Sequence, residues 1–117
     1  MYHPPLSPPG WVFPIVWLIL YTLMGIAAYR IYMKNPKAEA LKLYIIQLAV
    51  NFLWPIFFFN LGWQLFAAVW ILLLWYLVWL LIKEFAKIDQ GAARLLIPYL
   101  IWLTFATYLN IVIALHR

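Results

Sequence analysis

This 117-residue sequence contains no cysteine, few acidic residues and no charged residue in the middle of its apolar stretches. No cysteine occurs, which excludes disulfide bonds, thiolate metal sites and a cysteine nucleophile. The only acidic residues are Glu39, Glu84 and Asp89, and none lies in the middle of an apolar stretch. The sequence therefore lacks the intramembrane carboxylate of a proton- or ion-coupled transporter and the carboxylate pair of a hydrolase. The only histidines, His3 and His116, supply too few ligands for a metal site or a haem in the core.

Four long apolar stretches account for most of the chain, of which 69% is hydrophobic and only 9% charged. They cover residues 11–33, 41–60, 61–82 and 95–115. A helix needs about 20 apolar residues to cross a bilayer, and these stretches lack the alternation typical of barrel strands. The sequence predicts an all-α, multi-pass membrane bundle of four transmembrane helices, which forms one domain over residues 1–117.

Basic residues gather in two of the links between these stretches. Residues 30–42 contain four, residues 83–94 contain three, and the link around residues 61–64 contains none. Arg117 is the only lysine or arginine near either terminus of the sequence. Positive charge on one side of the membrane is typical of membrane topology, so the two basic links should share a side and both termini should lie opposite. The net charge of +5 therefore does not indicate nucleic-acid binding.

Prolines mark the places where helices should begin, bend or be absent. Four of them fall in residues 1–10, which we expect to form a stiff, extended lid rather than a helix. Pro14 suits the first turn of a helix. Pro55 lies inside the second apolar stretch, where it should kink the helix and free a backbone carbonyl near Asn51. Gly62 marks a tight turn into the third stretch.

Several polar side chains lie inside the apolar stretches. Gln47 and Asn51 share one helix face, and the fourth stretch contains Thr104, Thr107 and Asn110. Polar groups in lipid need partners, so these side chains should face the bundle interior. Two interpretations remain open at this point. They either hold helices together, or they are the few polar anchors of an apolar ligand pocket.

Aromatic residues make up 21% of the chain and include eight tryptophans. Those near the ends of stretches are expected to anchor at the membrane interface, namely Trp11 and Trp63. Those deeper in the stretches either fill space or form flat walls for a flat apolar ligand, namely Trp17, Trp54, Trp70 and Trp102. Trp75 and Trp79 lie on another face of their helix and favour contact with lipid or a partner protein.

Four motifs resemble those of one known family in order and spacing. They are PPGWVFPIVWLILYTLMGIAAY at 8–29, QLAVNFLWPIFF at 47–58, LGWQLF at 61–66 and AARLLIPYLIWLTFATYLN at 92–110. They are similar to those of the translocator protein family, also called tryptophan-rich sensory proteins. The resemblance implies a membrane protein of bacteria or mitochondria that binds porphyrins, sterols and synthetic benzodiazepine-type ligands between its helices.

The resemblance also implies which residues contact a ligand. Matching motif to motif, the ligand-binding positions are Trp17, Tyr21, Asn51, Trp54, Trp63, Trp102, Ala106 and Leu109. In bacterial members of the family, the counterparts of Trp17 and Trp102 are linked to light-dependent breakdown of protoporphyrin. These two residues are therefore the candidate catalytic residues, with no cofactor and no metal.

The sequence departs from the family pattern at several places. Family members have five helices, and the first of them has no counterpart in this sequence. We therefore expect either a shortened form of the family fold or a second copy of the chain that occupies the place of the missing helix. Leu6 replaces a tryptophan of the lid. Ile111 replaces the tyrosine of a terminal sterol-recognition motif, which ranks porphyrins above sterols. Leu43 and Gln47 occupy the positions of a glycine-rich dimer face.

The function favoured by these observations is a receptor or sensor for porphyrins and similar flat apolar molecules in a bacterial membrane. The alternatives are a light-dependent porphyrin-degrading activity, a carrier of sterols or other apolar molecules, and a structural scaffold. The expected partners are the small molecule, the lipid bilayer and a second copy of the chain.

Overall fold

The computed structural model of the chain describes residues 10–115, which are helical apart from short links and contain no strand. The elements are α1 (Val12–Lys34), α2 (Glu39–Pro55), the π-helix η1 (Ile56–Asn60), α3 (Gln64–Ala86), α4 (Gln90–Leu95) and α5 (Ile97–Leu115). Four segments are long and apolar enough to cross a membrane: Val12–Lys34, Glu39–Asn60, Gln64–Ala86 and Gln90–Leu115. The predicted all-α bundle with four spans is confirmed.

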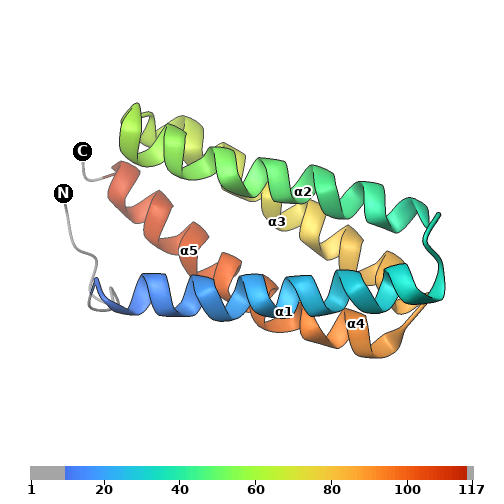
Figure 1. Cartoon of the computed structure of the whole chain (residues 1–117). Coiled ribbons are helices and arrows are strands. Elements are labelled where there is room, and N and C mark those ends of the chain that lie inside the picture. Colours follow the sequence, from blue (N-terminus) through green and yellow to red (C-terminus); the bar gives the residue numbers. More distant parts are fainter. Residues whose placement is uncertain (1–9, 116–117) are drawn as a thin grey trace.

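The helices form an elongated bundle that measures 46 × 24 × 19 Å. In Figure 1, α1 and α2 run along opposite sides of the view, with α5 crossing between them. α3 packs mainly against α5 and α2, whereas α1 packs mainly against α4. The start of α1, the turn from η1 to α3 and the end of α5 lie at one end of the bundle. The α1–α2 and α3–α4 links, which carry the basic residues, lie at the other end.

Residues at helical spacing form the core of the bundle. On α1 the buried residues are Leu20, Met24, Ala27 and Ile31, three or four positions apart. α3 contributes a longer stripe from Ala67 to Phe85. Fully buried alanines, such as Ala27 and Ala67, allow close helix approach, which favours helix association where lipid removes the hydrophobic drive. Large apolar residues on the other faces are exposed, as lipid contact requires.

Pro55 changes the helix type rather than simply bending it. Proline has no backbone N–H, so the bond to the carbonyl of Asn51 cannot form, and α2 ends at Pro55. The chain continues as η1, closed by a bond from the Leu61 N–H to the Ile56 carbonyl at 2.9 Å. Gly62 then reverses the chain with φ of 67°, a left-handed conformation that favours glycine. α3 therefore starts at Gln64 rather than at residue 61 as expected.

Ionic contacts between Asp89 and two basic residues, Arg30 and Lys34, join α1 to the beginning of the fourth span, and this cluster is called the clasp below. The Asp89 carboxylate accepts bonds from the Gly91 N–H at 3.2 Å and from Arg30 Nε at 2.5 Å, and pairs with Lys34 Nζ at 3.3 Å. The guanidinium of Arg30 holds the pKa of the Asp89 carboxyl well below its usual range. Asp89 caps α4, so the fourth span begins at Gln90, earlier than expected. The α-helix is interrupted at Leu96, two residues before Pro98.

Candidate ligand cavity

A cavity of about 470 Å³ lies at the end of the bundle opposite the basic links. α1 contributes Phe13, Pro14, Trp17 and Tyr21 to its lining, at spacings that place them on one helix face. α2 and η1 contribute five residues, including Asn51, Trp54 and Phe58, and α5 contributes five more from Trp102 to Ile113. Three spans that are distant in sequence, namely α1, α2 with η1, and α5, therefore line one site.

Aromatic rings make the cavity walls flat and well packed. The Trp17 and Trp102 rings lie 6.3 Å apart at 90°, and Trp17 stacks on Tyr21 at 5.6 Å. Phe13 meets Trp102 edge to face at 5.6 Å. Such pairs are preferred aromatic geometries that fix each ring against its neighbour. The site therefore presents flat π surfaces to an occupant.

The tryptophans of the cavity differ in how their indole N–H groups are paired. Trp54 Nε1 donates to Asn110 Oδ1 at 2.8 Å, and Asn110 Nδ2 donates to the Gln64 carbonyl at 2.9 Å. Trp102 Nε1 is buried and, within the described part of the chain, has no hydrogen-bond partner. An unpaired buried donor costs about 1–3 kcal/mol. Because this nitrogen is not accessible from the cavity, Trp102 meets an occupant with its ring rather than with its N–H.

The other polar corner of the cavity is built from Tyr21 and Asn51. The Tyr21 hydroxyl donates to Asn51 Oδ1. Asn51 Nδ2 donates to the Tyr99 hydroxyl at 2.8 Å, and that hydroxyl donates to Gln47 Oε1 at 2.9 Å. Gln47 and Asn51, which were predicted to share a face of the second span, are therefore joined to α5 through Tyr99, and Asn51 is joined to α1 through Tyr21.

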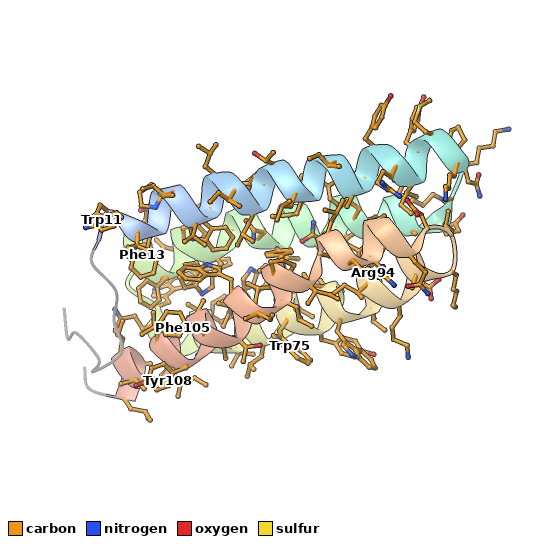
Figure 2. All side chains as sticks on the ribbon, turned by 90° about the horizontal axis from the view of Figure 1, so that it is seen from below. Trp11, Phe13, Trp75, Arg94, Phe105 and Tyr108 are labelled. Carbon is orange, nitrogen blue, oxygen red and sulfur yellow. The ribbon has the colours of Figure 1, made fainter. Side chains whose placement is uncertain are left out.

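The lining that falls within residues 10–115 contains no charged side chain. Figure 2 shows Phe13, Phe105 and Tyr108 toward one end of the bundle and Arg94 toward the other. Charged groups are costly to bury without a partner. The cavity thus suits a molecule whose enclosed part is apolar, with isolated hydrogen-bonding atoms at its edge.

The structure brings seven of the eight predicted ligand-binding residues to this cavity, including both candidate catalytic tryptophans. The seven are Trp17, Tyr21, Asn51, Trp54, Trp102, Ala106 and Leu109. Trp63 lies elsewhere: its side chain is exposed, and its ring stacks on Phe57 at 6.0 Å with an angle of 6° between planes. The chain reversal at Gly62 directly precedes Trp63, which packs on the first residues of η1 rather than between the helices.

One further expectation about polar side chains needs correction, and one of the deep tryptophans proves to fill space rather than to line the cavity. Thr104 was expected to face the interior, but it is exposed and donates to the Leu100 carbonyl at 3.0 Å. A threonine can satisfy its hydroxyl on its own helix, so burial is not required. The Thr104 oxygen also accepts from Trp75 Nε1 at 2.9 Å, which ties Trp75 to α5. Trp70 is half-buried and donates to the Val50 carbonyl at 2.9 Å, away from the cavity.

Sequence reasoning missed several lining residues and one supporting residue. Phe13 and Phe58 each lie four positions from a predicted residue, Trp17 and Trp54, and helical spacing could have identified them. Tyr99 was not singled out, although a tyrosine in an apolar stretch needs a partner for its hydroxyl. The expected lid and its Leu6, together with His3 and His116, lie outside the described residues.

The sequence is similar to those of known proteins over nearly its whole length. The TspO/MBR family model matches residues 1–116. The tryptophan-rich protein TspO of Chlorobaculum tepidum is 40% identical over 94% of this chain and 72% of its own length. The tryptophan-rich sensory protein of Cereibacter sphaeroides is 40% identical over 89% of this chain and 66% of its own length. The translocator protein of Homo sapiens is 38% identical, with 92% and 66% covered.

The chain thus spans about two thirds to three quarters of the length of these relatives. Bacterial proteins are among the most similar, which favours a bacterial membrane. With four spans that are long and apolar enough to cross a bilayer, and with a family match over nearly its whole length, the chain belongs to the TspO/MBR family of integral membrane proteins.

Proposed function

We propose that this protein is a membrane receptor or sensor whose cavity binds porphyrins and similar flat apolar molecules. The observation that carries the proposal is a cavity walled by aromatic rings and lined by few polar groups, among them Tyr21 and Asn51. A porphyrin has two flat faces for the rings and nitrogen atoms that can bond to the polar corner formed by Tyr21 and Asn51. The cavity volume of about 470 Å³ falls in the range of about 300–1,000 Å³ typical of small-molecule sites.

Titration with protoporphyrin in the dark tests this function. We expect saturable binding by the purified protein, measured by porphyrin absorbance and tryptophan quenching. Trp102→Phe should weaken binding about two- to tenfold, because the smaller ring offers a bound porphyrin less stacking surface. Trp79→Phe is the matched control, because Trp79 lies on the exposed face of α3 beneath Lys83 and should leave affinity unchanged. Equal affinity of all three proteins would contradict the proposed placement.

Light-dependent porphyrin oxidation is the second candidate function. It is favoured by the perpendicular contact of Trp17 and Trp102, because both indoles line the cavity and indoles are readily oxidised. Dioxygen would be the oxidant and the bound porphyrin the molecule that loses electrons. Under illumination, Trp17→Phe and Trp102→Phe should slow bleaching when compared at equal porphyrin occupancy. Equal bleaching rates in all proteins would leave binding as the sole function.

A further inference from the structure

A chain of hydrogen bonds runs from the cavity into the core in a single direction. Tyr21 donates to Asn51, Asn51 donates to Tyr99, and Tyr99 donates to Gln47. Gln47 Nε2 finally approaches the Met24 sulfur at 3.9 Å. Each bond thus points away from the cavity and toward the core.

The inner end of this chain decides its direction. A thioether sulfur can accept a hydrogen bond but cannot donate one. The Gln47 amide therefore turns its nitrogen toward Met24 and its oxygen toward Tyr99. Met24, Gln47 and Tyr99 are each 0% exposed, so the surrounding medium offers no replacement partner for any of them.

The direction of the chain determines what the cavity meets at its outer end. Tyr21 carries the only hydroxyl in the described part of the lining, and its hydrogen is used on Asn51. The Tyr21 oxygen is therefore available to an occupant only as an acceptor. If the Gln47 amide turned over, every bond in the chain would reverse, and the Tyr21 hydrogen would become available to the cavity.

We infer that Met24, Gln47 and Tyr99 are positioning residues that determine ligand specificity, although none of them lines the cavity. They keep the Tyr21 oxygen as an acceptor, so the site selects molecules that carry an N–H or O–H donor at that edge. This inference rests on the proposed function of the cavity as a site for flat ligands. It adds a chemical requirement to the flat, apolar shape that the aromatic walls favour.

A matched pair of fluorescent probes, 1-hydroxypyrene and 1-methoxypyrene, tests the inference. Both are flat and apolar, but only the first can donate a hydrogen bond. The wild-type protein should bind 1-hydroxypyrene about three- to tenfold more tightly, the range expected for one hydrogen bond in a membrane protein. The measured quantity is the ratio of the two dissociation constants, which a general loss of stability would not change selectively.

Two variants alter the chain of hydrogen bonds at residues that do not line the cavity. Met24→Leu removes the acceptor-only sulfur at similar volume, and Tyr99→Phe removes the hydroxyl at the middle of the chain. In both, the ratio should fall toward one. The controls are Met33→Leu, which alters an exposed methionine of the same helix, and Tyr108→Phe on α5. Both controls should keep the wild-type ratio.

The outcomes separate this inference from the proposed function. A wild-type ratio near one, or failure of both pyrenes to bind a protein that binds protoporphyrin, would overturn the inference alone. A wild-type ratio retained by Met24→Leu and Tyr99→Phe would also overturn it. If protoporphyrin and both pyrenes all fail to bind, the proposed function fails and the inference falls with it.

Discussion

Individual residues in this protein often serve two neighbours at once. Asn110 is 1% exposed, holds the Trp54 indole with its oxygen and binds the first turn of α3 with its nitrogen. It thereby fixes one wall of the cavity and the turn that follows η1. An apolar residue of similar size at this position would leave the Trp54 indole N–H without its acceptor and would remove the second bond to the Gln64 carbonyl.

Asn110→Leu should therefore destabilise the protein by about 1–2 kcal/mol, the sum of two hydrogen bonds in a membrane protein. The measurement is thermal unfolding in detergent, with protoporphyrin affinity measured in parallel. Thr107→Val is the control, because the buried Thr107 hydroxyl bonds only to the Leu103 carbonyl of its own helix at 2.7 Å. A loss of stability in the control as large as that in Asn110→Leu would refute the argument.

At the scale of helical elements, η1 sets the position of one cavity wall. A π-helix holds more residues per turn than an α-helix, and such segments occur frequently at functional sites. Pro55, Phe58 and Phe59 all line the cavity. Their orientation depends on the missing N–H of Pro55. If the α-helix continued in place of η1, the residues after Pro55 would be rotated about the helix axis, by about 100° for each position of register shift.

Pro55→Ala restores that N–H and should extend α2 as a regular α-helix through η1. We expect unchanged or higher thermal stability together with weaker protoporphyrin binding, because Phe58 and Phe59 would leave the wall. Pro36→Ala, in the link between α1 and α2, is the control and should change neither property. Unaltered affinity in Pro55→Ala would show that the wall does not depend on the π-helix.

The clasp between α1 and α4 is the second feature at this scale, and it should depend on pH. The pKa of Asp89 is lowered in the folded protein, so its pairing stabilises the fold above the ordinary carboxyl pKa of about 3.9. That contribution should be lost progressively as the pH falls below this value toward the folded-state pKa. It should be constant between about pH 5 and pH 7.

Thermal midpoints of the wild type and Asp89→Asn, measured from pH 7 to pH 3, test this dependence. The difference between them should be constant down to about pH 5 and shrink below about pH 4. Glu84→Gln is the control, because Glu84 is exposed and its salt bridge, at 3.1 Å, is to the nearby Lys87 just after the end of α3 rather than to another helix. A difference that grows as the pH falls would reverse the sign of the argument.

At the scale of the whole molecule, the bundle has one basic end and one end that holds the cavity. Lys37 and Lys87 lie in links at the first end, and Leu61 lies in the turn at the second. The chain contains no cysteine, so single cysteines at these positions have no background. In sealed vesicles, a membrane-impermeant maleimide should label Lys37→Cys and Lys87→Cys from one face and Leu61→Cys from the other. Labelling of Lys37→Cys and Leu61→Cys from the same face would refute the topology.

The spans, their order and most of the candidate site could be predicted because hydrophobic length and helical spacing are properties of the sequence itself. Asn51 and Trp54 lie three positions apart on one helix, so their proximity follows from helix geometry. The start of α3 and the position of Trp63 could not be predicted in the same way. They depend on the change from an α-helix to a π-helix at η1 and on the chain reversal at Gly62. Both alter the position at which the next helix starts and the direction in which Trp63 points. The contact of Tyr99 with Gln47 and Asn51 joins residues about fifty positions apart and requires the tertiary packing.

Because the cavity lies away from the basic links, molecules dissolved in the two leaflets of the bilayer should differ in their access to it. The bundle is 46 Å long, and the cavity lies toward the end away from Arg94. Its lining runs from Phe13 and Ile113 near that end to Tyr21 and Trp102 near the middle of their spans. In a membrane, the site should therefore lie mainly in one leaflet, the one farther from the basic links. Apolar molecules dissolved in that leaflet reach the depth of the site directly, whereas molecules that enter from the other side must first cross the bilayer midplane.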